Sequence, residues 1–225
     1  RYEDTEGSLG DSDPSLVEVK EDESDQGEKE EGYDYENKVG DKKQYVPNTL
    51  TEETPLLLEN DNYAIKMVPL DSSIAASKVK VEKEEVLSPY EEIEQKTVKA
   101  IYDTADDSHS YEYESLNEGI KESLILNEKP ISNIFEYSIS LKGMIAEISE
   151  TGAIVLKDEK TGKEVASIDK PFMNDASGDA YSEDIESKIT KESGSDDENS
   201  YILTLTLSKK YLNSKERAYP VIIDP

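Results

Sequence analysis

Residues 144–168, MIAEISETGAIVLKDEKTGKEVASI, contain three short apolar-rich runs separated by two polar connections, each of which includes one glycine. The runs occupy residues 144–148, 153–157 and 164–168. Runs of this length suit strands, and Gly152 and Gly162 supply the positive φ that tight hairpin connections need. The stretch therefore predicts a β-meander of three consecutive antiparallel strands.

The same pattern extends to both sides of the meander. Short runs alternate apolar with polar side chains, and Gly, Pro, Asn and Asp separate the runs. A two-residue period with one polar face is typical of half-buried antiparallel strands. We expect such strands at residues 63–68, 77–82, 97–102, 109–114, 120–126, 134–141, 185–190, 201–207 and 219–223. The predicted fold class is mainly β, antiparallel and β-sandwich-like, with little helix and short helical candidates at 89–95 and 208–213.

Acidic residues are concentrated near the N-terminus. Residues 21–31 contain no apolar side chain, so this run cannot bury enough surface to offset the entropy of ordering it. We expect residues 1–32 to be an acidic, partly disordered lead-in. A smaller β region is expected at 33–96, and the main β-sandwich-like domain at 97–225.

The net charge of the chain is -28, from 53 acidic and 25 basic residues. Such a charge repels nucleic acid and anionic membranes, because binding to either depends on lysine and arginine. We therefore expect no nucleic-acid partner and no membrane insertion. The absence of cysteine excludes disulfides and thiolate chemistry. The chain begins at Arg1 without a signal peptide or an initiating Met, which is typical of a fragment or a processed chain.

The only histidine, His109, follows an acidic turn, Asp106-Asp107-Ser108, and precedes a predicted strand. A hydrolytic triad needs a serine and an acid that converge on the histidine, and the chain has no Gly-x-Ser-x-Gly motif. A solvated turn residue is the simpler interpretation. We accordingly expect no enzyme activity, no catalytic residue and no bound cofactor, and a glycoside hydrolase or esterase stays a remote alternative.

A calcium site is conceivable in the loop that begins at Asp175. Oxygen-bearing side chains fall at the spacing of an EF-hand loop, namely Asp175, Ser177, Asp179, Glu183 and Glu186. Ala180 stands where that loop requires glycine, and helical flanks are missing. The alternative is an ordinary turn between strands.

Three motifs occur in a fixed order: EGIKESLIL at 118–126, PFMNDASG at 171–178, and KYLN at 210–213 leading to RAYPVIIDP at 217–225. Together they resemble the N-terminal extracellular region of large Gram-positive wall-associated proteins with Rhs/YD repeats or DNRLRE-type domains. The resemblance implies an exported protein, located at the cell wall or outside the cell. It also implies that a further domain of the same polypeptide follows Pro225, and it supplies no catalytic residue.

The function expected from the sequence is a non-catalytic structural or interaction module of a large bacterial cell-surface protein. An adhesion module that binds carbohydrate or calcium is the alternative. In that case exposed tyrosines would hold cell-wall or host glycans, whereas tyrosines buried between strands would count against it.

Overall fold

The computed structural model describes residues 2–3, 9–10, 13–19, 32–74, 77–87, 93–192 and 199–224. Residues 1, 4–8, 11–12 and 20–31 of the acidic lead-in lie outside this described part, and so do residues 89–92 of the first helical candidate. Strands dominate the described residues, which confirms the mainly β, antiparallel fold class.

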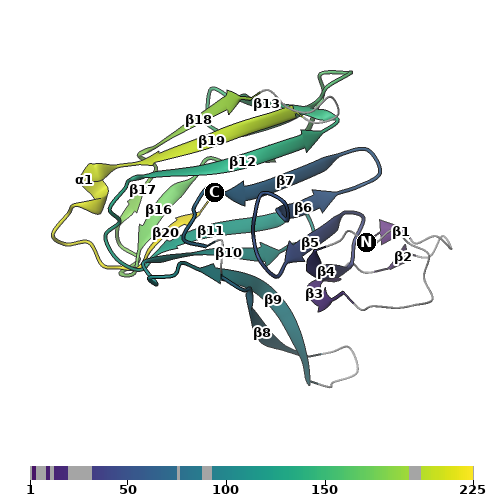
Figure 1. Cartoon of the computed structure of the whole chain (residues 1–225), viewed down its shortest axis with the longest axis horizontal. Coiled ribbons are helices and arrows are strands. Elements are labelled where there is room, and N and C mark those ends of the chain that lie inside the picture. Colours follow the sequence, from purple (N-terminus) through teal and green to yellow (C-terminus); the bar gives the residue numbers. More distant parts are fainter. Residues whose placement is uncertain are drawn as a thin grey trace.

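Fifteen strands of the described part form one large sheet, in the order β17-β16-β20-β11-β10-β9-β3-β4-β5-β6-β7-β12-β19-β18, with β8 paired to β9 alone (Figure 1). Each pairing in this order is antiparallel. The strands are β3 (Asp13–Glu18), β4 (Tyr33–Val39), β5 (Lys43–Pro47), β6 (Leu56–Glu59), β7 (Ala64–Pro69), β8 (Lys80–Leu87), β9 (Ile93–Asp103), β10 (His109–Ser115), β11 (Ile120–Leu126), β12 (Ile134–Lys142), β16 (Phe172–Asp175), β17 (Tyr181–Ser182), β18 (Ile185–Lys191), β19 (Asn199–Leu207) and β20 (Val221–Asp224).

The large sheet curls on itself into a near-barrel. Its two end strands, β17 and β18, are separated in the chain only by Glu183 and Asp184, so the two edges of the sheet meet. Figure 1 shows β16, β20 and β11 below β12 and β19 in this view. A separate hairpin of β1 (Tyr2–Glu3) and β2 (Leu9–Gly10) lies at the N-terminus.

A second, three-stranded sheet consists of β13 (Met144–Ile148), β14 (Ile154–Asp158) and β15 (Glu164–Ile168). It is the predicted meander, and Gly152 and Gly162 have φ values of +91° and +68° in its two turns. β19 of the large sheet anchors it: the backbone N–H of Ala146 donates to Tyr201 Oη at 3.2 Å, and Asn199 Nδ2 donates to the Met144 carbonyl at 2.9 Å. Local turn chemistry and these two contacts fix the position of the small sheet.

The interior of the curled sheet is a single apolar core. Along β12, residues Phe135, Tyr137, Ile139 and Leu141 are buried, and the residues between them are more exposed. β19 repeats this alternation, with Tyr201, Leu203, Leu205 and Leu207 inside. Successive side chains of a strand point to opposite faces, so the alternation in the sequence becomes an inside and an outside of the near-barrel.

The C-terminal part follows the sequence prediction closely. The helix α1 (Lys209–Leu212) begins after Ser208, whose hydroxyl accepts a hydrogen bond from the Tyr211 backbone N–H. Serine is a preferred residue at this position because it satisfies a free N–H group of the first turn. The final strand β20 then pairs with both β11 and β16.

One helical candidate is wrong in its described part. Residues 93–95 belong to β9, which pairs with β8 from Ile93 to Ile101. Cross-strand pairing therefore prevails over weak helical propensity. The domain boundaries at 32/33 and 96/97 stay predictions, and β9 spans the second of them. No helix in the described residues is long and apolar enough to cross a membrane.

Candidate functional site

The carboxylate of Asp175, first in the predicted calcium loop, is fully engaged by protein groups. Its Oδ1 accepts hydrogen bonds from the backbone N–H and the hydroxyl of Ser177. Its Oδ2 accepts from Arg217 Nη1 at 2.9 Å and from the Ala218 N–H at 3.1 Å. The bonds from Ser177, Ala218 and Arg217 lower the pKa of Asp175 to about 2.

The other predicted calcium ligands are not gathered around Asp175. Glu183 accepts from Lys170 Nζ at 2.9 Å and from Tyr181 Oη at 2.8 Å, and Glu186 is exposed on β18. The backbone N–H of Asp179 donates to Ser177 Oγ. In the described residues, no group of three or more His, Asp or Glu side chains is arranged to hold a metal ion. The calcium assignment stays a prediction, and the contacts show an ordinary turn at these residues.

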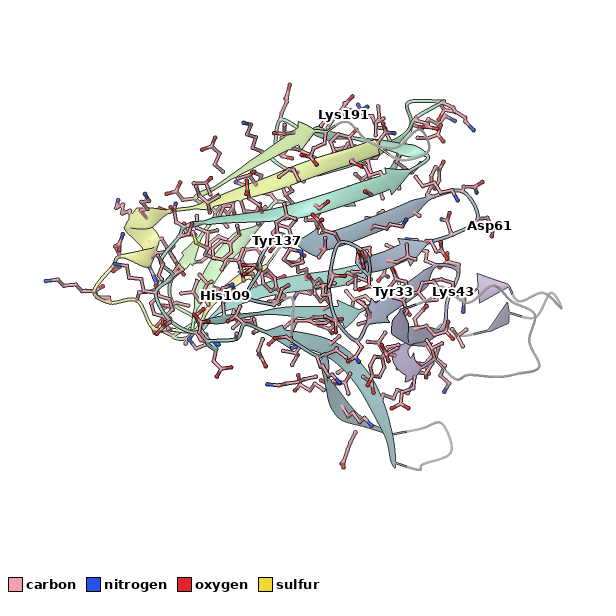
Figure 2. The ribbon with its side chains drawn as sticks, viewed as in Figure 1. Tyr33, Lys43, Asp61, His109, Tyr137 and Lys191 are labelled. Atoms are coloured by element: carbon pink, nitrogen blue, oxygen red, sulfur yellow. The ribbon has the colours of Figure 1, made fainter. Side chains whose placement is uncertain are left out.

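His109 lies at the start of β10, where the sequence analysis expected a solvated turn residue (Figure 2). That interpretation is wrong: the side chain is 15% exposed, and its ring packs edge-on against Tyr111 and Phe135. Both ring nitrogens have partners. Nε2 lies 2.6 Å from Asp71 Oδ2, and Nδ1 lies 2.9 Å from Ser108 Oγ. The acid partner, Asp71, lies just after β7 and 38 residues before His109 in the chain. Turn patterns near His109 therefore could not reveal it.

The surroundings of Asp71 favour its ionised form. The hydrogen bond with His109 is the largest of the effects on the pKa of Asp71 and holds it far below its usual range. Hydrogen bonds from the backbone N–H and hydroxyl of Ser73 lower this pKa further. Tyr111 Oη also approaches Asp71 Oδ2, at 3.3 Å. An ionised Asp71 accepts a hydrogen bond from His109 Nε2–H, and in that tautomer of the neutral ring the Nδ1 lone pair faces the Ser108 hydroxyl. In this tautomer, the imidazole can accept a proton from Ser108.

The three residues line a surface hollow of about 370 Å³. Lys129 and Glu136 also border it, so its wall carries both signs of charge. His109 joins the carboxylate of Asp71 and the hydroxyl of Ser108 in one hydrogen-bonded chain. This chain of groups can move protons between the hydroxyl and the imidazole.

Several of the tyrosines that could have bound sugars are inside the protein. Tyr102, Tyr111, Tyr113, Tyr137 and Tyr201 are each less than 5% exposed. Tyr102 and Tyr113 pack edge to face across β9 and β10, with ring centroids 5.9 Å apart. These five tyrosines form the core and do not form a binding platform, so they give the adhesion alternative no support.

Comparison with protein-family models gives no match, and no solved structure matches the chain. Three curated proteins do match, each 38% identical over 113 residues, which is 49% of this chain and 5% of the relative. They are the tRNA3(Ser)-specific nuclease WapA of Bacillus spizizenii, the tRNA(Glu)-specific nuclease WapA of Bacillus subtilis subsp. natto and the tRNA nuclease WapA of Bacillus subtilis strain 168. The matched segment is thus a small part of much longer proteins.

These relatives correct several sequence predictions. The assignment to proteins with Rhs/YD repeats or DNRLRE-type domains is wrong, because the matching proteins are WapA tRNA nucleases. The predictions of a non-catalytic module, of no enzyme activity and of no nucleic-acid partner are wrong for the same reason. The charge argument behind them concerns the surface of these 225 residues alone, whereas the relatives are named for the activity of far longer chains. The glycoside hydrolase and esterase alternatives receive no support.

Proposed function

We propose that the polypeptide to which this chain belongs is a bacterial nuclease that acts on tRNA. The observation that carries the proposal is the 38% identity over 113 residues to three WapA proteins, all of which are named as tRNA nucleases. The match covers 5% of each relative, so the proposal concerns the whole polypeptide.

The direct test is cleavage of tRNA by the full-length polypeptide. Purified protein is incubated with total bacterial tRNA, and the products are separated on a denaturing gel and identified by hybridisation. We expect at least one tRNA species to be cut while other RNA of similar size stays intact. If all tRNA remains intact under conditions in which a Bacillus relative cleaves it, the proposal is wrong.

The Asp71–His109–Ser108 cluster can be tested in the same assay. RNA cleavage by general acid–base catalysis requires a group that accepts a proton, and a positioned imidazole is the commonest such group. The change His109→Ala in the full-length polypeptide, with Lys129→Ala as a neighbouring control, measures what this cluster contributes. A loss of cleavage confined to His109→Ala would assign proton transfer to the cluster.

The matching relatives also bear on how a tRNA is chosen. Two of them are named for different tRNAs, tRNA3(Ser) and tRNA(Glu), yet both match this chain with the same identity over the same length. The strength of the match therefore does not follow the tRNA for which each relative is named. We therefore propose that residues outside the matched segment choose the tRNA.

The location predicted from the sequence, at the cell wall or outside the cell, is part of this proposal. It agrees with the matches to proteins of Bacillus. Detection of the polypeptide in washed cell walls and in the culture medium tests it, and confinement to the cytoplasmic fraction would contradict it.

A further inference from the structure

A cavity of about 440 Å³ lies between the two sheets. The inner face of the large sheet supplies one wall, with Leu58, Met67 and Leu203, and the small sheet supplies the other, with Ile154 and Ile168. Several of these apolar side chains are only partly buried, because they face the empty volume. Cavities of about 300–1,000 Å³ with mostly apolar walls are typical of small-molecule sites.

Five charged residues line the cavity, namely Lys42, Glu118, Lys121, Glu122 and Asp169, and Glu122 is the one that shares the phase of the buried leucines of β11. It lies on β11 in the same phase as Leu124 and Leu126, which are buried, so the strand turns it inward. Tyr113 is its direct partner on β10, and the Tyr137 hydroxyl donates a hydrogen bond to its carboxyl group. The Oε1 atom is buried and has no hydrogen-bond partner.

A carboxyl group in such a position is costly for the protein. Burial raises the pKa of Glu122 to about 7, and the bond from Tyr137 only partly opposes this. A buried oxygen without a partner carries a desolvation cost that a bound donor would remove. Glu122 lines the cavity, so a donor bound inside the cavity lies next to its carboxyl group.

We infer that the cavity binds a small apolar molecule that carries one amino group, with the ammonium paired to Glu122 and the apolar part packed between the sheets. A cationic head is favoured over a neutral one because charge-assisted hydrogen bonds are the stronger kind. The net charge of -28 also raises the local concentration of cations and disfavours anionic ligands. This inference does not rest on the proposed nuclease activity.

Binding of three eight-carbon probes tests the inference. n-Octylamine, 1-octanol and octanoate share an apolar tail and differ in the charge of the head. Isothermal titration calorimetry with the 225-residue chain at pH 8 gives their affinities. We expect octylamine to bind at least about tenfold more tightly than octanol, since a charged partner strengthens the hydrogen bond, and octanoate to bind most weakly.

The variant Glu122→Gln keeps the size of the side chain and removes its charge, and we expect it to abolish the preference for octylamine. Glu136→Gln is the matched control, because Glu136 is exposed on the outer face of β12 and accepts from Thr204. Ala166→Phe fills the cavity from β15 without touching the charge of Glu122, and should weaken octylamine and octanol alike. The inference is overturned if neither octylamine nor octanol binds, if the preference survives Glu122→Gln, or if Ala166→Phe leaves both affinities unchanged.

Discussion

Arg217 and Asp175 form a buried ion pair, with Arg217 Nη1 2.9 Å from Asp175 Oδ2 and the two side chains 9% and 1% exposed. The guanidinium also stacks on Tyr211, with its carbon 3.4 Å from the ring centroid. This contact connects the turn after β16 to the segment that leads into β20, and so holds the last strand against the rest of the sheet.

Arg217→Ala is expected to lower the free energy of unfolding markedly, because it leaves the Asp175 carboxylate buried without its cationic partner. Urea denaturation measures the change. Lys170→Ala is the control, since Lys170 pairs with Glu183 at the surface and such pairs contribute little. Equal losses in the two variants would contradict the structural role of the buried pair.

Glu122 should make the protein less stable as the pH rises. Its pKa is raised from 4.5 to about 7 in the folded state, so the folded protein holds a proton that the unfolded chain releases between these values. Stability is therefore lost from about pH 5 to pH 8 in the wild type. Glu122→Gln removes this dependence. Between pH 5 and pH 8 the variant should therefore lose less free energy of unfolding than the wild type, by on the order of 3 kcal/mol. Denaturation curves at pH 5 and pH 8 check it; parallel loss in the wild type and in Glu122→Gln would show that other groups cause the effect.

Leu126 tests the core on β11, where it is fully buried. Leu126→Ala should cost about 2–5 kcal/mol, because it removes buried methyl groups and leaves a cavity. Ile131 is fully exposed, and Ile131→Ala should change stability by no more than about 0.5 kcal/mol. Thermal and urea unfolding of both variants measure the difference. Similar values for the two would mean that β11 does not line the core.

Calcium is expected to leave the unfolding midpoint unchanged, because both oxygens of Asp175 already accept hydrogen bonds from Arg217, Ala218 and Ser177. Melting in calcium and in chelator tests this. A midpoint that rises with calcium, falls with chelator and no longer responds in Asp179→Asn would instead establish the predicted site.

The sequence predicted those parts of the fold that depend on nearby residues. The meander of β13, β14 and β15 follows from its two glycine turns, and α1 follows from the cap at Ser208. Both are local, so a few neighbouring residues decide them. The curl of the large sheet could not be predicted, because it depends on pairings such as that of β11 with β20, nearly 100 residues apart in the chain.

The site residues also differ in whether nearby sequence could reveal their contacts. Asp71 and His109 are far apart in the chain, so their contact had no local signal. Arg217 and Asp175 both belonged to motifs singled out in the sequence, but nothing in either motif paired them. Glu122 was detectable in principle: it shares the phase of Leu124 and Leu126, and an acidic residue in the apolar phase of a strand indicates an inward carboxyl group.

We have proposed that the polypeptide containing this chain is a tRNA nuclease and that residues outside the matched segment choose the tRNA. This proposal is tested most directly by identifying the tRNA species cut by the full-length polypeptide before and after its matched segment is replaced by that of the Bacillus subtilis strain 168 relative. We expect both proteins to cut the same tRNA species. Absence of cleavage by the unaltered polypeptide would contradict the nuclease assignment, and a switch to the tRNA of the donor would contradict the location of the specificity.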